Sequence, residues 1–343
     1  MFRRSFLTAT AAAVPALAMP GLVRAQERVV NLYSSRHYDS DRQLYDAFAQ
    51  ESGIRVRLIE ANADQLLERI RAEGANSPAD VIITVDASRL ARAREMNLTQ
   101  PVGSATVASR IPAALMGPDG HWMSVSRRAR VVMFDRARGA PEGLARYEDL
   151  ADPRFRNQIL VRSSGNGYNV ALAASFLAAN GAEATEGWAR GIVANLARPP
   201  QGGDSDQIRA MLAGQGRLAI ANTYYLGLMA TGTRAEDREL AQRVGVVFPN
   251  QGDRGTHANV SGAALVRTAP NPDHARRFLE FLTAPQAQRV FALGNMEFPA
   301  VPDAEVHPFL TALGSFREEA PDGARLLANA PEALRAMQRA GWR

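Results

Sequence analysis

Apolar strand-like segments alternate with amphipathic helix-like segments near the start of the chain. Residues 28–35, 54–59 and 80–85 are strand-like runs, and segments with apolar residues at helical spacing separate them. The first of these helices is expected to begin at residues 39–41 and the second at Asn62, both with side chains that cap a helix N-terminus. Strands connected through helices pair in parallel, with right-handed crossovers over both sheet faces. The pattern therefore predicts an α/β fold.

The same alternation continues in the second half of the chain. Strands are expected at residues 158–163 and 217–222, and helices at residues 169–179 and 205–213. A later helix is expected to begin at Pro272, because proline is favoured at the first helical position. The length of 343 residues is enough for two domains of ordinary size, each with its own buried core.

The N-terminal segment has the features of an export signal. Arg3 and Arg4 precede an apolar run at residues 6–23, and residues 23–25 supply small residues for cleavage. The order of residues 3–7 resembles the twin-arginine export motif, and a general secretory signal is the alternative. Residues 1–25 are therefore predicted to be removed after export. No later stretch is long and apolar enough to span a bilayer.

The composition excludes several kinds of chemistry. The chain has no cysteine and no lysine, so a disulfide, a thiolate metal site and a lysine Schiff base are all excluded. The formal net charge of +5 includes three arginines of the predicted signal, and acidic and basic residues are interspersed along the rest of the chain. The charge pattern therefore does not predict nucleic-acid binding.

Tyrosines follow three of the predicted strands. His37 and Tyr38 come after the first strand, Tyr168 follows the strand at the middle of the chain, and Tyr224 and Tyr225 come directly after the last of the three. In open α/β sheets, ligands bind beyond the carboxyl ends of the strands. Four of the seven tyrosines therefore lie where a ligand is expected.

A cluster of phenols suits a small, hard and highly charged cation. Such an ion favours an anionic oxygen donor, and its field lowers the phenol pKa from about 10. Ferric iron fits best, because zinc, copper and nickel prefer imidazole or thiolate, while calcium and magnesium prefer carboxylates and carbonyls. Phenolates from all these tyrosines would leave a net negative charge around a trivalent ion, which an arginine can balance. By position in the sequence, the candidates are Arg36, Arg128 and Arg162.

Other interpretations of the same residues remain open at this level. Buried tyrosines commonly pack as aromatic bodies with one hydrogen bond, as expected for Tyr33 and Tyr45, and the adjacent tyrosine pair could pack in the same way. His37 could be a hydrogen-bonded loop histidine instead of a metal ligand. Residues 163–167 could hold an oxyanion with backbone N–H groups before a helix. Sequence spacing does not decide between these roles.

Several stretches of the chain resemble the ferric-ion-binding periplasmic proteins of iron ABC importers, in particular the cyanobacterial iron-uptake branch. The resemblance covers nearly the whole chain after the predicted signal. It implies a type II periplasmic binding fold, in which two α/β lobes joined by crossing strands close over a ligand in the cleft between them. The stretches that carry the resemblance are residues 31–38, 73–80, 197–202 and 221–225.

The resemblance also implies roles for individual residues. His37 matches a histidine that binds the metal in some members of the family. Arg128 lies in a family-like stretch near the expected crossing strands, where it is expected to balance the charge of the site without touching the ion. The residues that match the phenolate ligands of the family are Tyr38, Tyr168, Tyr224 and Tyr225.

Lobe boundaries and partners follow from the same resemblance. Residues 26–126 together with residues 256–343 are expected to form the first lobe, and residues 127–255 the second. A receptor of this kind acts in the periplasm, is expected to be a monomer, and delivers ferric iron to an inner-membrane ABC permease and its ATPase.

Three classes of function are compatible with these residues. The principal hypothesis is a non-enzymatic ferric receptor whose lobe closure signals occupancy. The alternative is a binding protein for a small oxyanion or organic solute, with serines such as Ser34, Ser35, Ser163 and Ser164 as hydrogen-bond donors. An enzyme would need His37 as a base and a tyrosine as an acid. No nucleophile elbow, carboxylate pair or cofactor fingerprint in the sequence supports an enzyme.

Overall fold

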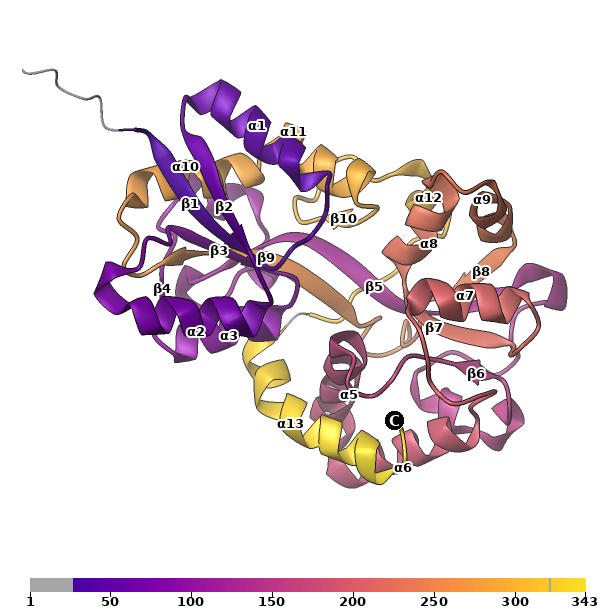
Figure 1. Cartoon of the computed structure of the whole chain (residues 1–343). Helices are drawn as coiled ribbons and strands as arrows, with labels where there is room; N and C mark the ends of the chain where they lie inside the picture. The colour runs from indigo at the N-terminus through magenta and orange to yellow at the C-terminus, as the bar shows by residue number, and fades with distance from the viewer. Residues whose placement is uncertain (1–26, 321) are drawn as a thin grey trace, which may run out of the picture.

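A computed structural model describes residues 27–320 and 322–343, and the predicted export signal at residues 1–25 lies outside the described residues. The chain forms two α/β lobes with strands running between them (Figure 1). The first lobe lies on the left of the view and the second on the right. The α/β architecture predicted from the alternation of segments is confirmed.

The first lobe is built on parallel strands that follow one another in the chain. β1 (Val29–Ser34) lies between β2 (Arg55–Glu60) and β3 (Val81–Thr84) and pairs with both in parallel. The next strand, β9 (Ala258–Val266), comes from the far end of the chain and runs antiparallel to β3. The helices that pack on this sheet are α1 (Asp41–Ser52), α2 (Ala63–Glu73), α3 (Ala87–Glu95) and α10 (Pro272–Leu282).

One long strand, β5 (Met123–Asp135), belongs to both lobes. Its first half, up to Ala129, pairs with β9 in the first lobe. Its second half, from Arg130 onward, pairs with β7 (Leu218–Asn222) and β8 (Val244–Val247) in the second lobe. Because side chains alternate along a strand, Arg128 and Arg130 lie on the same face of β5. This strand is therefore the crossing element that the resemblance implied.

The second lobe repeats the strand-then-helix arrangement. β6 (Ile159–Leu160) pairs in parallel with β7, and the full sheet has the order β2-β1-β3-β9-β5-β7-β6. The strand expected at residues 158–163 is thus shorter than predicted, because its second half turns away into the loop before the next helix. The helices of this lobe are α5 (Gly167–Asn180), α6 (Ala182–Ala194), α7 (Asp204–Leu212), α8 (Thr223–Thr231) and α9 (Ala235–Gln242).

The C-terminal helix α13 (Gly323–Arg339) joins the core of the second lobe. Its buried residues, together with Trp342, pack in a cluster with residues of β7, α5 and α6. Its first residue, Gly323, touches the first lobe, since a Cβ there would lie 2.7 Å from the backbone oxygen of Ala87. The observed packing differs from the predicted boundary, which assigned all of residues 256–343 to the first lobe. Apolar residues at helical spacing predict a helix, but they do not indicate which lobe its apolar face packs against.

The remaining described elements are short. Among the residues that the structure describes, no helix is long and apolar enough to cross a membrane. β10 pairs with β5, and β4 pairs with β9. The short elements are β4 (Thr99–Gln100), α4 (Ala105–Arg110), α11 (Pro285–Arg289), β10 (Phe298–Pro299) and α12 (Pro308–Thr311).

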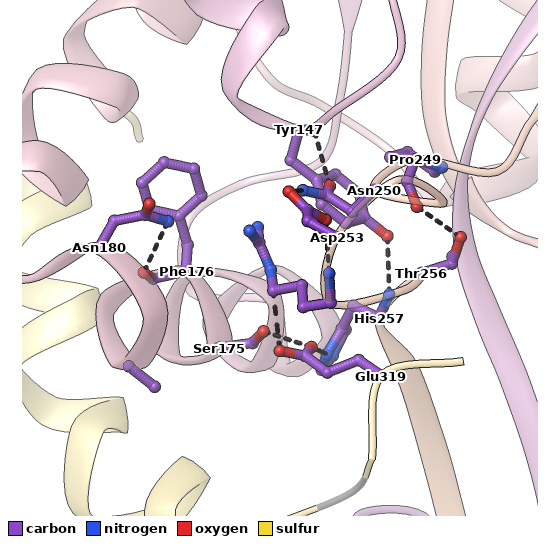
Figure 2. Close-up of polar contacts among 12 residues, drawn as sticks. Tyr147, Ser175, Phe176, Asn180, Pro249, Asn250, Asp253, Thr256, His257 and Glu319 are labelled. Atoms are coloured by element: carbon purple, nitrogen blue, oxygen red, sulfur yellow. Dashed lines mark hydrogen bonds and ion pairs between the residues drawn. The ribbon is translucent and has the colours of Figure 1, made fainter. Parts of the chain in front are cut away.

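A buried polar cluster ties the second lobe to the crossing strands (Figure 2). Tyr147 Oη donates a hydrogen bond to the backbone oxygen of Arg130 at 2.5 Å and accepts one from the backbone N–H of His257 at 3.1 Å. The imidazole Nδ1 of His257 lies 3.3 Å from Glu319 Oε2, which also accepts a hydrogen bond from Ser175 of α5. These contacts connect α5, the residue before β9 and the segment after α12.

Candidate metal centre

Four tyrosines from three separate segments meet between the lobes. The phenol oxygens of Tyr168 and Tyr224 lie 3.4 Å apart. The ring of Tyr38 meets the ring of Tyr224 edge-on, with the ring centroids 6.3 Å apart, and the centroids of Tyr224 and Tyr225 are 4.1 Å apart. The structure therefore brings together the tyrosines that the sequence placed at strand ends.

The local fold explains why these tyrosines converge. Tyr168 lies in the first turn of α5, where the Asn166 side chain accepts a hydrogen bond from the Tyr168 N–H at 3.2 Å and caps the helix. Tyr224 and Tyr225 lie in the first turn of α8, directly after β7. Because β6 and β7 are parallel, the two helices begin at the same edge of the sheet.

Close packing of α8 also depends on a glycine. A Cβ on Gly227 would lie 2.7 Å from the Cβ of Met296, closer than real Cβ atoms approach one another. Gly227 is two residues after the tyrosine pair, on the same helix. The absence of a side chain there lets α8 lie directly against the segment that carries Met296.

Arginines surround the phenol rings from both lobes. The guanidinium carbon of Arg128 lies 5.8 Å from the ring centroid of Tyr168 and 5.9 Å from that of Tyr224. Arg36 lies over the ring of Tyr38, with its guanidinium carbon 4.6 Å from the centroid. All three arginines suggested by sequence position thus lie beside the cluster, since Arg162 Nη1 is 3.5 Å from the Tyr225 hydroxyl.

A buried carboxylate that no sequence pattern identified links two of these arginines. Glu297 is completely buried, and its two oxygens contact Arg128 Nη1 at 3.3 Å and Arg36 Nη2 at 3.1 Å. Arg36 also pairs with Asp41 at 2.7 Å. Glu297 is far from both arginines in the sequence and belongs to no motif, so only the tertiary contact reveals it. The arginines therefore have charged partners of their own before any ion binds.

The protein environment favours the protonated form of Tyr38, Tyr224 and Tyr225 in the absence of a cation. Burial raises the pKa of the Tyr38, Tyr224 and Tyr225 phenols above the usual value. The negative charge of Glu297 raises the pKa of Tyr38 further, while the positive charges of Arg128 and Arg36 lower it. Deprotonation of these buried groups therefore requires an additional positive charge at the site, such as a bound metal ion.

His37 differs from the tyrosines in its exposure. Its side chain is 59% exposed, and its Nδ1 lies 3.9 Å from a carboxylate oxygen of Glu60. It lines the mouth of the same cleft as Tyr168 and Tyr225. The imidazole is therefore close to the cluster but is not packed into it.

The cleft between the lobes has a volume of about 820 Å³. Residues of the first lobe such as Ser35, the tyrosine-bearing helices of the second lobe, and the apolar residues Leu326 and Ala330 of α13 line it. Among the residues that the structure describes, no group of three or more His, Cys, Asp or Glu side chains is placed to hold a metal ion. Tyr168 and Tyr225 are the members of the tyrosine cluster that line this cleft, and phenol oxygens suit a hard trivalent cation.

This fold and cleft are those of a solute-binding protein. The family model for bacterial extracellular solute-binding proteins matches residues 39–293, and the chain belongs to this family. The predicted type II periplasmic binding fold is confirmed by this match and by the structural neighbours of the chain.

Relatives within the family are iron proteins. The chain is 45% identical to iron uptake protein A1 of Synechocystis sp. over 318 residues, which cover 93% of this chain and 88% of that protein. It is similar to a Trichodesmium protein, IdiA or FutA, in complex with iron and citrate, with 45% identity and a TM-score of 0.87 over 92% of this chain and 100% of that one. A Bordetella ferric binding protein has 37% identity and a TM-score of 0.85 over 92% of this chain and 99% of that one. The resemblance inferred from the sequence is confirmed.

Proposed function

We propose that this protein captures ferric iron with the phenolate oxygens of Tyr38, Tyr168, Tyr224 and Tyr225. The observation that carries the proposal is the 3.4 Å separation of the Tyr168 and Tyr224 phenol oxygens, which are close enough to bind one ion together. The iron and ferric names of the relatives favour the same metal. Arg128, which lies against two of the rings, balances the negative charge of the phenolates.

Both lobes contribute to this proposed site. Tyr38 and the exposed His37 come from the first lobe, and the other three tyrosines come from the second. An ion bound to all of them favours the closed arrangement of the lobes, because only that arrangement supplies every ligand. His37 is proposed to add a ligand or a hydrogen bond at the mouth of the cleft.

Delivery follows from the proposed class of receptor. Proteins that close over a solute present a different surface when loaded, which a membrane importer can recognise. We propose an inner-membrane ABC permease and its ATPase as the partners, the periplasm as the location, and a monomer as the working state. Export by the twin-arginine or the general secretory route is proposed from residues 1–25.

An oxyanion or organic solute is the second candidate. The cleft of about 820 Å³ is larger than a bare ion requires, and the buried Ser35 hydroxyl in its wall has no hydrogen-bond partner among the residues that the structure describes. Catalysis is not proposed. Ser175, His257 and Glu319 are the residue types of a hydrolase triad, but Ser175 and His257 both contact the same oxygen of Glu319, an arrangement that gives the serine no base.

A visible absorption titration with ferric citrate tests the proposal. The wild-type protein is expected to develop an intense phenolate-to-iron charge-transfer band and to keep its iron through desalting. The double variant Tyr224→Phe, Tyr225→Phe is expected to lose the band, because it removes two donor oxygens and little else. The matched control is Tyr33→Phe, whose hydroxyl contacts Glu73 at 3.2 Å, outside the cluster.

A colourless wild-type protein that loses iron on desalting would exclude the ferric site and favour the organic or oxyanion receptor. Under that second function, the double variant would bind its solute much as the wild type does.

A further inference from the structure

Arg130 lies on β5 at the point where the strand enters the second lobe. Its side chain is completely buried, although a guanidinium is among the groups most costly to remove from water. One reason to retain such a group in a core is that its hydrogen bonds fix the arrangement of the segments around it. The partners of Arg130 indicate what it holds.

The guanidinium reaches three separate segments of the second lobe. Nη1 donates hydrogen bonds to Asp204 Oδ2 at 2.7 Å and to Asn222 Oδ1 at 3.1 Å. Nη2 donates to Asn169 Oδ1 at 2.6 Å. Asp204 is the first residue of α7, Asn222 is the last of β7, and Asn169 is in the first turn of α5.

Two of these partners adjoin the tyrosines of the proposed site. Asn169 follows Tyr168 directly, and Asn222 is separated from Tyr224 by a single residue. The Asn169 side chain also donates to the backbone oxygens of Arg162 at 2.9 Å and Ser163 at 3.0 Å, which begin the loop that leads to Tyr168. The segments on both sides of Tyr168 are therefore connected to one guanidinium.

The third partner closes the network. Asp204 Oδ2 accepts a hydrogen bond from the backbone N–H of Asn222 at 2.9 Å as well as the one from Arg130. The end of β7, from which the tyrosine pair extends, is thus held by a side-chain contact and a backbone contact at once. No ligand atom is needed for any of these bonds.

We propose that Arg130 is a positioning residue that sets the relative places of Tyr168, Tyr224 and Tyr225 before the ion arrives. This inference rests on the proposed ferric site. A guanidinium suits the task because its donors lie in one rigid plane and reach several acceptors in fixed directions, whereas an ammonium is a point charge on a flexible stem. Ligands held in this way bind with geometry already in place.

Arg128 and Arg130 are held by different segments, although they are two residues apart on one strand and their guanidinium carbons lie 5.8 and 5.9 Å from the Tyr168 ring centroid. Arg128 Nη2 donates to the backbone oxygen of Val85 in the first lobe at 2.6 Å, and Nη1 pairs with Glu297, so this guanidinium is held from the first-lobe side. Among the described residues, the hydrogen-bond partners of the Arg130 guanidinium lie in the second lobe. The tyrosine positions that Arg130 is proposed to set therefore all belong to the second lobe.

The test is a ferric citrate titration of Arg130→Lys and Asn169→Ala, with the charge-transfer band and the ferric affinity as readouts. Arg130→Lys keeps the charge and the pairing with Asp204 but loses the planar fork. We expect its ferric affinity to fall by about 10- to 100-fold, as for other partners that orient metal ligands, with a shifted or weaker band per bound iron. Asn169→Ala removes one arm of the network and is expected to change both readouts in the same direction by less.

The matched control is Arg127→Lys on the same strand. Arg127 pairs with Glu318 at 2.7 Å and has no part in the network. Its ferric affinity is expected to stay within about twofold of the wild type, with an unchanged band.

Each outcome has a defined meaning. If the wild type gives the band and both Arg130→Lys and Asn169→Ala keep wild-type affinity and colour, the positioning role is overturned and the ferric site stands. The same holds if these variants lose thermal stability while the band per bound iron is unchanged, because that result indicates a structural role only. A wild type without any band would overturn the ferric site and this inference together.

Discussion

The two lobes hold their parts of the tyrosine cluster in different ways. In the second lobe, three tyrosines extend from the first turns of α5 and α8, and the Arg130 network connects the segments that carry them. In the first lobe, Tyr38 extends from the loop between β1 and α1, beside the exposed His37. Its ring packs against the guanidinium of Arg36.

This difference separates the proposed site into a fixed part and a part supplied by closure. The second-lobe tyrosines share one lobe and one hydrogen-bond network, so their spacing does not depend on how the lobes are arranged. Tyr38 and His37 join them only when the first lobe is near. A receptor built in this way has much of its ligand geometry in place beforehand and uses the remaining ligands to report occupancy.

The difference between the lobes is tested most directly by substituting one tyrosine from each lobe and comparing the losses of ferric affinity. Tyr168→Phe is expected to lower ferric affinity by more than about 100-fold, the upper end of the effect of groups that only orient a ligand. Tyr38→Phe is expected to lower it by a smaller factor, because the three second-lobe tyrosines remain. Chelator competition followed at the charge-transfer band measures both.

Tyr45→Phe is the control, since the Tyr45 ring packs against Phe278 in the first-lobe core and not in the cleft. Equal losses for Tyr168→Phe and Tyr38→Phe, or a larger loss for Tyr38→Phe, would contradict the division into fixed and closing parts.

The pH dependence of ferric affinity tests how many of the phenols, from either lobe, lose a proton when iron binds. A free phenol has a pKa of about 10 and is already neutral near pH 7. Burial raises the pKa of Tyr38, Tyr224 and Tyr225 further, so these phenols are neutral before an ion binds. Each one that binds ferric iron must release a proton, so ferric affinity is expected to fall as the pH falls. Chelator competition between pH 5 and 8 gives the number of protons from the slope of log affinity against pH.

Tyr38→Phe is expected to reduce that slope by about one proton, because it removes one phenol that must ionise. An unchanged slope in this variant would mean that Tyr38 does not bind the metal as a phenolate.

Removal of His37 is expected to have the smallest effect. His37→Ala should lower ferric affinity by at most about tenfold, because an imidazole open to water contributes less than a buried donor. The band should keep its position, since the phenolates that produce it are unchanged. A large loss of affinity with a shifted band would show instead that the imidazole turns into the site when the lobes close.

Much of the fold was predictable because it follows from local patterns. The alternation of segments predicted the parallel strands of the first lobe, and the predicted helix cap at Asn62 is present in the structure. The cap expected at residues 39–41 is not, since Ser40 before α1 makes no side-chain capping hydrogen bond among the described residues. The last helix was predicted to belong to the first lobe, but it contacts both lobes and packs most of its buried residues against the second. The apolar stripe of α13 identifies a helix, but the surface of α5 and α6 that covers it belongs to residues more than a hundred positions earlier.

The tyrosines were predictable for a similar reason, since each follows a strand and strand ends meet at one edge of a parallel sheet. The groups around them were not. Glu297 contacts Arg36 across 261 positions, and Arg130 contacts Asn222 across 92. Nothing in the spacing of the sequence indicates either contact.

By itself, the sequence determined the α/β class, the positions of the four tyrosines at strand ends, and the absence of cysteine and lysine chemistry. Only the tertiary structure decided that these tyrosines meet, that Arg130 connects the segments of three of them, and that His37 is exposed. The reason is physical. Periodicity and capping depend on neighbours within one segment, whereas burial, charge pairing and the shape of a cleft depend on which distant segments pack together.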